Sequence, residues 1–190
     1  MPLIIKVASI PKERMQVYFI DNDEYFKRKA LYSDEDGNLF PDNDERAMFF
    51  AKGVVETVKK LNWAPDIIHV HGWMASLLPL YLRQYYKNDP LFTDSKIVTS
   101  IYNSDIKGPI GGDLVEKIKF DSIPEEKLGL LSTANHSNLL KIAIENSDAV
   151  IKGSENIPED IENFILDNNI PVLDFNSTED YSNFYLTEVL

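Results

Sequence analysis

Cysteine is absent from this sequence of 190 residues. Disulfides, thiolate zinc sites and cysteine nucleophiles are therefore excluded, and the chain suits a reducing compartment. Long apolar runs are missing too: no stretch approaches the roughly 20 residues of a membrane span. The start Met-Pro-Leu-Ile-Ile also lacks the basic region of a secretory signal. We therefore expect a cytoplasmic protein without membrane contact.

Basic residues are fewer than acidic residues in this sequence. Lys and Arg number 19 against 31 Asp and Glu, which gives a formal net charge of −12 and an isoelectric point near 4.6. Such a surface opposes binding to nucleic acid and to anionic lipid. Histidine is scarce as well. His69 and His71 supply two nitrogens and His136 lies far along the chain, so we expect no metal and no cofactor.

The apolar fraction of 44% and the aromatic fraction of 11% are typical of a globular protein, and the length favours one core. Strands are predicted where short β-branched runs lie between turn residues, at 3–10, 15–20, 67–70, 96–102, 149–153 and 170–175. Helices are predicted where apolar residues recur at helical period, at 42–61, 73–86, 114–120, 139–144, 158–168 and 178–190. Because strands alternate with helices, we expect an α/β, Rossmann-like, three-layer domain with a mostly parallel sheet.

Local signals refine this outline. Asp42 and Glu45 have the spacing of a capping box, which predicts Asp42 as the N-cap of the helix that follows. Pro79 lies inside the helix predicted at 73–86, where it should kink the helix or delay its start. The segment "SDEDGN" at 33–38 is predicted to be an exposed loop. The segment "GPIGGD" at 108–113 lacks the spacing and the lysine of a P-loop, and we interpret it as an ordinary loop.

The strongest candidate site lies where the strand at 67–70 turns into a helix. His69 and His71 alternate with Val70, so both point to one side of the strand, and in open α/β sheets ligands bind beyond the carboxyl ends of strands. Gly72 would let the backbone approach a ligand, and Trp73 offers a flat face for a sugar ring. The alternative is a satisfied core histidine beside a tryptophan that plugs the sheet edge.

Two further groups are candidates. Tyr102 and Asn103, in "SIYN", end the next strand, and adjacent parallel strands would bring them close to His71. Asp21 and Tyr25, in "FIDNDEYF", combine a carboxylate with an aromatic ring and could bind carbohydrate, although a solvated acidic loop is the alternative. No serine triad or carboxylate pair is recognisable, so the reaction chemistry does not follow from these residues alone.

At "DNDERAMFFAKGVVETVKKLNWAPDIIHVHGW" the sequence resembles bacterial glycogen synthases and plant starch synthases. Their pattern D-N-x-x-R, followed by P-D-[IV]-[IV]-H-x-H-D-W-H, is matched in order by Asp42, Asn43, Arg46, Pro65, Asp66, His69, His71 and Trp73. Upstream, "VYFIDNDEYFKRKALY" is similar to the family's F-[IL]-D-x-x-x-[YF]-F-x-R. Downstream, "VTSIYN" and "NSDAVIKGSE" are similar to its T-I-H-N and A-D-x-[IV]-x-T-V-S. The ordered series is more specific than any one motif.

The resemblance implies the first of two Rossmann-like domains in an enzyme that transfers glucose from ADP-glucose to α-1,4-glucan. It implies such an N-terminal-like domain at 1–155, with 156–190 as a C-terminal α/β extension that packs on it. The fold is expected to be incomplete, since nothing like the family's lysine-bearing K-T-G-G-L loop precedes Leu3. The binding partners implied are an α-glucan or a nucleotide sugar, together with a second glycosyltransferase domain or, by pairing of an exposed sheet edge, a homodimer.

Three residues depart from the family pattern. Gly72 and Met74 stand where the family has the last aspartate and last histidine of H-x-H-D-W-H, and Tyr102 replaces the histidine of T-I-H-N. His71 is the remaining candidate for a catalytic group. We therefore expect a pseudoenzyme that does not turn over ADP-glucose alone. The alternative is a noncatalytic module that retains the fold and binds glucan or a partner protein.

Overall fold

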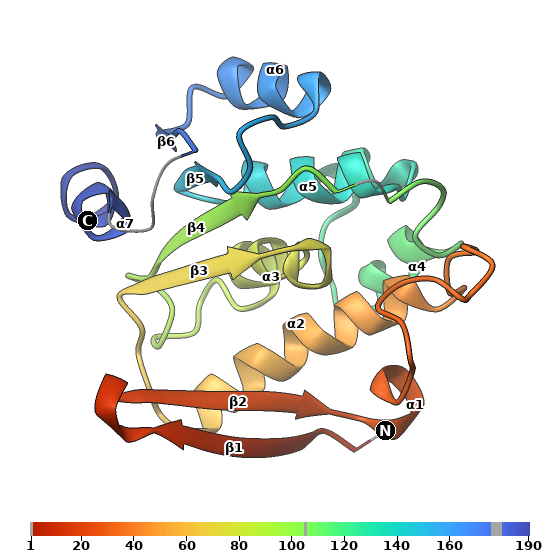
Figure 1. Cartoon of the computed structure of the whole chain (residues 1–190), viewed down its shortest axis with the longest axis horizontal. Helices are drawn as coiled ribbons and strands as arrows, with labels where there is room; N and C mark the ends of the chain where they lie inside the picture. Colours follow the sequence, from red (N-terminus) through yellow and green to blue (C-terminus); the bar gives the residue numbers. More distant parts are fainter. Residues whose placement is uncertain (1, 105, 176–179) are drawn as a thin grey trace.

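The structure is a computed structural model that describes residues 2–104, 106–175 and 180–190. Its centre is a four-stranded parallel sheet in the order β3-β4-β5-β6, with a separate antiparallel hairpin of β1 and β2 (Figure 1). The strands are β1 (Ile4–Ile10), β2 (Met15–Asp21), β3 (Ile67–His71), β4 (Lys96–Ile101), β5 (Ala149–Lys152) and β6 (Val172–Leu173). The predicted α/β fold with a parallel sheet is confirmed.

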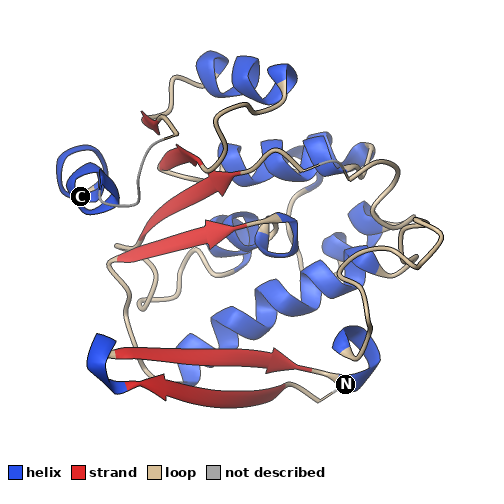
Figure 2. Cartoon of the chain, in the orientation of Figure 1, coloured by secondary structure: helices blue, strands red, loops and turns tan. Residues whose placement is uncertain are grey.

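Helices cover both faces of the parallel sheet, as Figure 2 shows in blue. The α-helices are α1 (Asp23–Phe26), α2 (Asn43–Lys60), α3 (Leu78–Leu80), α4 (Leu114–Lys119), α5 (His136–Glu145), α6 (Glu159–Asp167) and α7 (Tyr181–Phe184). The short 3-10 and π-helical turns are η1 (Pro11–Glu13), η2 (Trp73–Ala75), η3 (Tyr81–Tyr85), η4 (Glu125–Lys127), η5 (Gly129–Ser132) and η7 (Tyr185–Val189). None of these described helices is long and apolar enough to cross a membrane.

The main core lies between the sheet and α2, α3 and α5. Ala47, Ala51 and Val55 recur every four residues along α2, so they share one face of the helix, and each is at most 1% exposed. Val70 of β3 points into this core, which leaves its neighbours His69 and His71 on the opposite face of the sheet. That opposite face is where the C-terminal helix packs.

The C-terminal segment forms the third layer. Phe184 of α7 and Val189 of η7 contact Val98, Ala149 and Ile151 on the face opposite α2. The predicted strand at 170–175 is reduced to the two residues of β6. The helix predicted at 178–190 begins at Tyr181 in the structure, and its residues 178–179 lie outside the described part.

The helix predicted at 73–86 is broken into three pieces. The 3-10 turn η2 is followed by α3, in which Pro79 is the second residue, and then by the π-helical turn η3. Proline is tolerated at the start of a helix because its missing N–H has no partner there. The predicted delay of the helix start is thus confirmed: of the helix predicted at 73–86, the α-helical and π-helical part begins at Leu78.

The predicted capping box is also wrong. Asp42 is the N-cap residue of α2, but its carboxylate accepts no N–H from the helix. It pairs instead with the guanidinium of Arg28, which stacks over Phe40. Glu45 accepts a hydrogen bond from the Tyr25 hydroxyl and pairs with Lys117. Both carboxylate oxygens of Asp42 accept from the Arg28 guanidinium, and such a bidentate ion pair outweighs a single bond to a backbone N–H.

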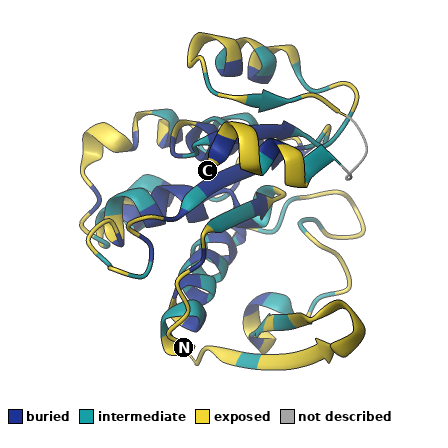
Figure 3. Cartoon of the chain, turned by 90° about the vertical axis from the view of Figure 1, so that its left-hand side faces the viewer, coloured by how far each residue is buried: buried dark blue, intermediate teal, exposed yellow. Residues whose placement is uncertain are grey.

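The hairpin of β1 and β2 stands apart from the parallel sheet and lies against α2 (Figures 1 and 3). Ile20 reaches α2 at Gly53, where an added Cβ would lie 3.2 Å from its Cγ2 atom. Most of the hairpin is exposed, as its yellow colour in Figure 3 shows. The acidic loop at 33–38 is exposed over 34–38, as predicted.

Candidate functional site

The two histidines of β3 lie on the same face of the sheet, with ring centroids 3.9 Å apart. The parallel register sets them beside β4, where Ser100 Oγ lies 2.7 Å from His69 Nε2. One step further, the hydroxyl of Tyr102 lies 2.7 Å from His71 Nδ1. The carboxyl ends of β3 and β4 therefore carry one connected polar cluster of His69, His71, Ser100 and Tyr102.

His69 is closed off by the C-terminal segment. Its Nδ1 atom lies 2.6 Å from the hydroxyl of Tyr185, and the ring of Tyr181 is edge-on at 5.7 Å. Both ring nitrogens of His69 are thus hydrogen-bonded within the protein. Burial, together with the nearby charge of His71, lowers the pKa of His69 to about 4, so this imidazole is neutral at pH 7.

This environment makes a testable prediction for His69. In a pH titration followed by NMR of the ring protons, its midpoint is expected at about 4 rather than near the ordinary value of 6.5. Because the unfolded chain binds this proton more readily, the stability contributed by His69 is full above pH 6.5 and is lost as the pH falls towards 4. A midpoint close to 6.5 would show that Tyr181 and Tyr185 do not shield the ring.

His71 differs from His69 in its exposure. It is an exposed residue, its Nδ1 is tied to Tyr102, and no described residue is hydrogen-bonded to its Nε2. Burial of part of the ring lowers the pKa of His71, which favours the neutral imidazole at pH 7. A neutral ring can donate or accept one hydrogen bond at Nε2, which suits a hydroxyl group.

The remaining residues of the strand-to-helix turn have different surroundings. Gly72 has a φ of 72° and open space around it. Trp73 is half-buried, with the ring of Tyr32 edge-on at 6.5 Å and the guanidinium of Arg46 at 5.8 Å. Asn103 is exposed, and its backbone N–H donates to Ser154 Oγ at 3.1 Å. Trp73 is therefore held by neighbouring side chains on the core side.

Asp21 and Tyr25 are not joined to this cluster. Asp21 ends β2 and pairs with Lys6 of β1. Tyr25 is buried in α1 and donates from its hydroxyl to Glu45 at 3.0 Å. Burial and this carboxylate raise the pKa of Tyr25 to about 12. Within the described residues, both side chains thus take part in contacts around the hairpin and α2.

Two residues that contact the cluster were not predicted from the sequence. Tyr185 lies 116 residues from His69, and no local pattern connects them. Gly153 follows β5 and receives the ring of Tyr102 against its backbone. The one available signal for Gly153 was its place as the last residue of the strand predicted at 149–153, beside the expected ends of the other two strands.

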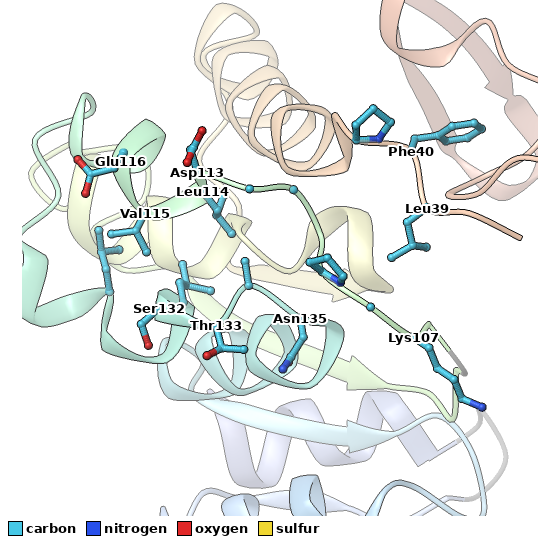
Figure 4. A pocket seen from close by; sticks show the side chains of 18 of the residues that line it. Leu39, Phe40, Lys107, Asp113, Leu114, Val115, Glu116, Ser132, Thr133 and Asn135 are labelled. Carbon is cyan, nitrogen blue, oxygen red and sulfur yellow. The ribbon is translucent and has the colours of Figure 1, made fainter.

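The structure also has a cavity of about 1270 Å³. None of the four cluster residues lines it. Figure 4 shows Leu39 and Phe40 on one side and Ser132, Thr133 and Asn135 on another. The loop at 107–113, with its glycines, crosses between them. Over the described ranges, no group of three or more histidine, aspartate or glutamate residues could hold a metal ion.

An open parallel sheet with helices on both faces and a polar cluster at the carboxyl ends of its strands has the architecture of a Rossmann-like domain. The family model for the starch synthase catalytic domain matches residues 2–169 of the chain. The chain belongs to the glycogen and starch synthase family.

Individual relatives agree with this assignment. The glycogen synthase of Chlorobium luteolum is 39% identical over 155 residues, which cover 80% of this chain and 31% of the relative. That of Vibrio parahaemolyticus is 34% identical over 149 residues, which cover 77% and 30%. The chain thus spans about a third of the length of these relatives.

A solved structure shares the fold. The catalytic domain of starch synthase IV from Arabidopsis thaliana, bound to ADP and acarbose, matches with a TM-score of 0.67 at 17% identity. The match covers 94% of this chain and 38% of that one.

Proposed function

We propose that this chain is one part of a glucosyltransferase that transfers glucose from ADP-glucose to an α-1,4-glucan, and that it binds the glucan but does not transfer glucose alone. The observation that carries the proposal is the exposed His71, whose Nε2 is free of any described partner beside Tyr102 at the carboxyl ends of β3 and β4. The relationship to glycogen synthases supports the glucan as the ligand.

The charges near the site support the absence of transfer by the chain alone. A bound diphosphate needs cationic or backbone donors. The guanidinium of Arg28 pairs with Asp42, and the buried Arg46 donates to the Tyr25 carbonyl and to Asn43. Gly72 adds no side chain to the turn. Arg46, whose guanidinium lies 5.8 Å from the Trp73 ring, and Arg28 are thus both engaged in contacts within the protein.

The proposal is tested by titrating the chain with maltoheptaose and, separately, with ADP-glucose in a calorimeter, followed by an assay for transfer of labelled glucose. Maltoheptaose is expected to bind weakly, and His71→Ala is expected to weaken the binding about tenfold through loss of one hydrogen bond to a sugar hydroxyl. Phe120→Ala, which removes a side chain that is 92% exposed at the end of α4, is the control. Transfer of glucose by the chain alone would contradict the proposal.

The second candidate is a noncatalytic glucan-binding module. The residues that favour it are Gly72, Met74 and Tyr102, because none of them can supply the carboxylate or imidazole found in the family pattern. A mixing experiment distinguishes the two candidates. The chain is combined with a separate polypeptide that contains the part of the Chlorobium luteolum enzyme that this chain does not match. Glucose transfer by the mixture supports the first candidate, and glucan binding without transfer supports the second.

A further inference from the structure

We propose that Tyr102, seated on Gly153 and held by His71, is the platform on which a glucose ring of an α-glucan stacks. This inference rests on the proposed function and assigns the ligand's contact surface. Tyr102 follows β4 and Gly153 follows β5, and these two strands are neighbours in the sheet. The platform therefore extends the polar cluster of β3 and β4 to the end of β5.

The Tyr102 ring packs directly on Gly153, where the lack of a side chain leaves room for it. A Cβ atom added at Gly153 would lie 2.4 Å from Cε1, 2.7 Å from Cδ1 and 2.8 Å from Cζ of Tyr102. Carbon atoms do not approach so closely, so the ring lies against the bare backbone of Gly153. A side chain at this position would push the ring away from the sheet.

The ring is also fixed at its far end. The hydroxyl of Tyr102 lies 2.7 Å from His71 Nδ1, and the two ring planes are tilted by 34° at a centroid distance of 6.1 Å. The neighbouring backbone is tied down too, because Asn103 N–H donates to Ser154 Oγ, which joins the ends of β4 and β5. A ring that is already immobilised loses little conformational entropy when a ligand packs on it.

Part of Tyr102 remains accessible to solvent, since the residue is half-buried. Among the described residues, the ring of His71 is the one aromatic contact of Tyr102, and that contact lies at the edge of the platform. The C–H face of a pyranose ring is apolar and packs on an aromatic face, while its hydroxyls seek hydrogen bonds. His71, whose Nδ1 is bonded to the Tyr102 hydroxyl, can form a hydrogen bond with one of these sugar hydroxyls through its Nε2.

The charges favour a neutral sugar over a nucleotide sugar. The nearest lysine on β5, Lys152, pairs with Glu162 and Asp174 and is therefore already neutralised. The chain carries a net charge of −12, which repels a diphosphate. In the T-I-H-N pattern that the sequence resembles, Tyr102 takes the place of the histidine, and its ring offers a larger surface for stacking.

The test compares binding of maltoheptaose to four variants by saturation-transfer NMR and calorimetry. Tyr102→Phe keeps the ring and is expected to bind within about threefold of the unchanged chain. Tyr102→Ala removes the platform, and Gly153→Ala displaces it without removing any group that touches the ligand. Both are expected to weaken binding at least about tenfold. Phe120→Ala is the matched control for loss of an exposed aromatic ring.

The outcomes separate this inference from the function on which it rests. If the unchanged chain binds maltoheptaose and both Tyr102→Ala and Gly153→Ala bind it equally well, the platform is overturned and the glucan ligand stands. If the unchanged chain does not bind maltoheptaose, both are overturned. If ADP-glucose binds instead and Tyr102→Ala abolishes that binding, the assignment of a neutral glucan is overturned. Urea unfolding of Gly153→Ala establishes that the variant is folded.

Discussion

Replacing Gly111 by alanine is expected to lower the free energy of unfolding by about 3–5 kcal/mol, one of the two largest effects that the structure predicts. Gly111 has a φ of 86°, a left-handed conformation that costs an L-residue roughly 1–2 kcal/mol. Its added Cβ would also lie 2.1 Å from Cγ of Asp44. The carboxylate of Asp44 is fully buried and pairs with the partly exposed Lys117 Nζ at 2.8 Å, so moving it would leave a buried carboxylate without its partner.

The same loop offers a matched control. Gly112 has open space around its Cβ position, so Gly112→Ala is expected to change the free energy of unfolding by no more than about 0.5 kcal/mol. Urea unfolding of both variants, followed by circular dichroism, gives the comparison. Equal unfolding midpoints for the two variants would show that the loop does not pack on Asp44.

Gly111 illustrates what local sequence patterns miss. The segment at 108–113 was interpreted as an ordinary loop, because its glycines lack the spacing of a phosphate-binding motif. Its role depends on Asp44 and Lys117, which are 73 residues apart in the chain and meet only in the folded protein. Strands and helices were predicted more reliably because their signals lie within a few neighbouring residues. The failed capping box has the same cause, since Arg28 lies 14 residues before Asp42.

In the candidate site too, the features that depend on neighbouring residues could be predicted, and those that depend on distant residues could not. The side shared by His69 and His71 follows from strand alternation, and the approach of Tyr102 to His71 follows from adjacent parallel strands. Sequence alternation could not tell which of the two histidines is closed, because Tyr185 reaches His69 from the end of the chain. It also could not assign Trp73 to the core side, because this depends on Arg46 and Tyr32.

The contact between the C-terminal segment and the sheet leads to a second large effect. We propose that residues 156–190 fold as part of the same domain as 1–155. Phe184 is 5% exposed and packs against Val98 and Ile151 on the face of the sheet that carries His69. Phe184→Ala is therefore expected to lower the free energy of unfolding by about 3–4 kcal/mol, the sum of the lost apolar burial and the cavity left behind.

Two further measurements make this prediction specific. Leu186→Ala, in the adjoining turn η7, removes a side chain that is 71% exposed and is expected to cost less than about 0.5 kcal/mol. Loosening of the segment in Phe184→Ala admits water to His69, so the pKa of His69 should rise from about 4 towards 6.5, whereas Leu186→Ala should leave it unchanged. Equal stability of the two variants and equal His69 titrations would mean that the segment does not pack on the sheet. A loss of stability together with a raised His69 pKa would instead show that the segment packs on the core and shields His69 from solvent. His71 is then the histidine of the pair that can contact a ligand.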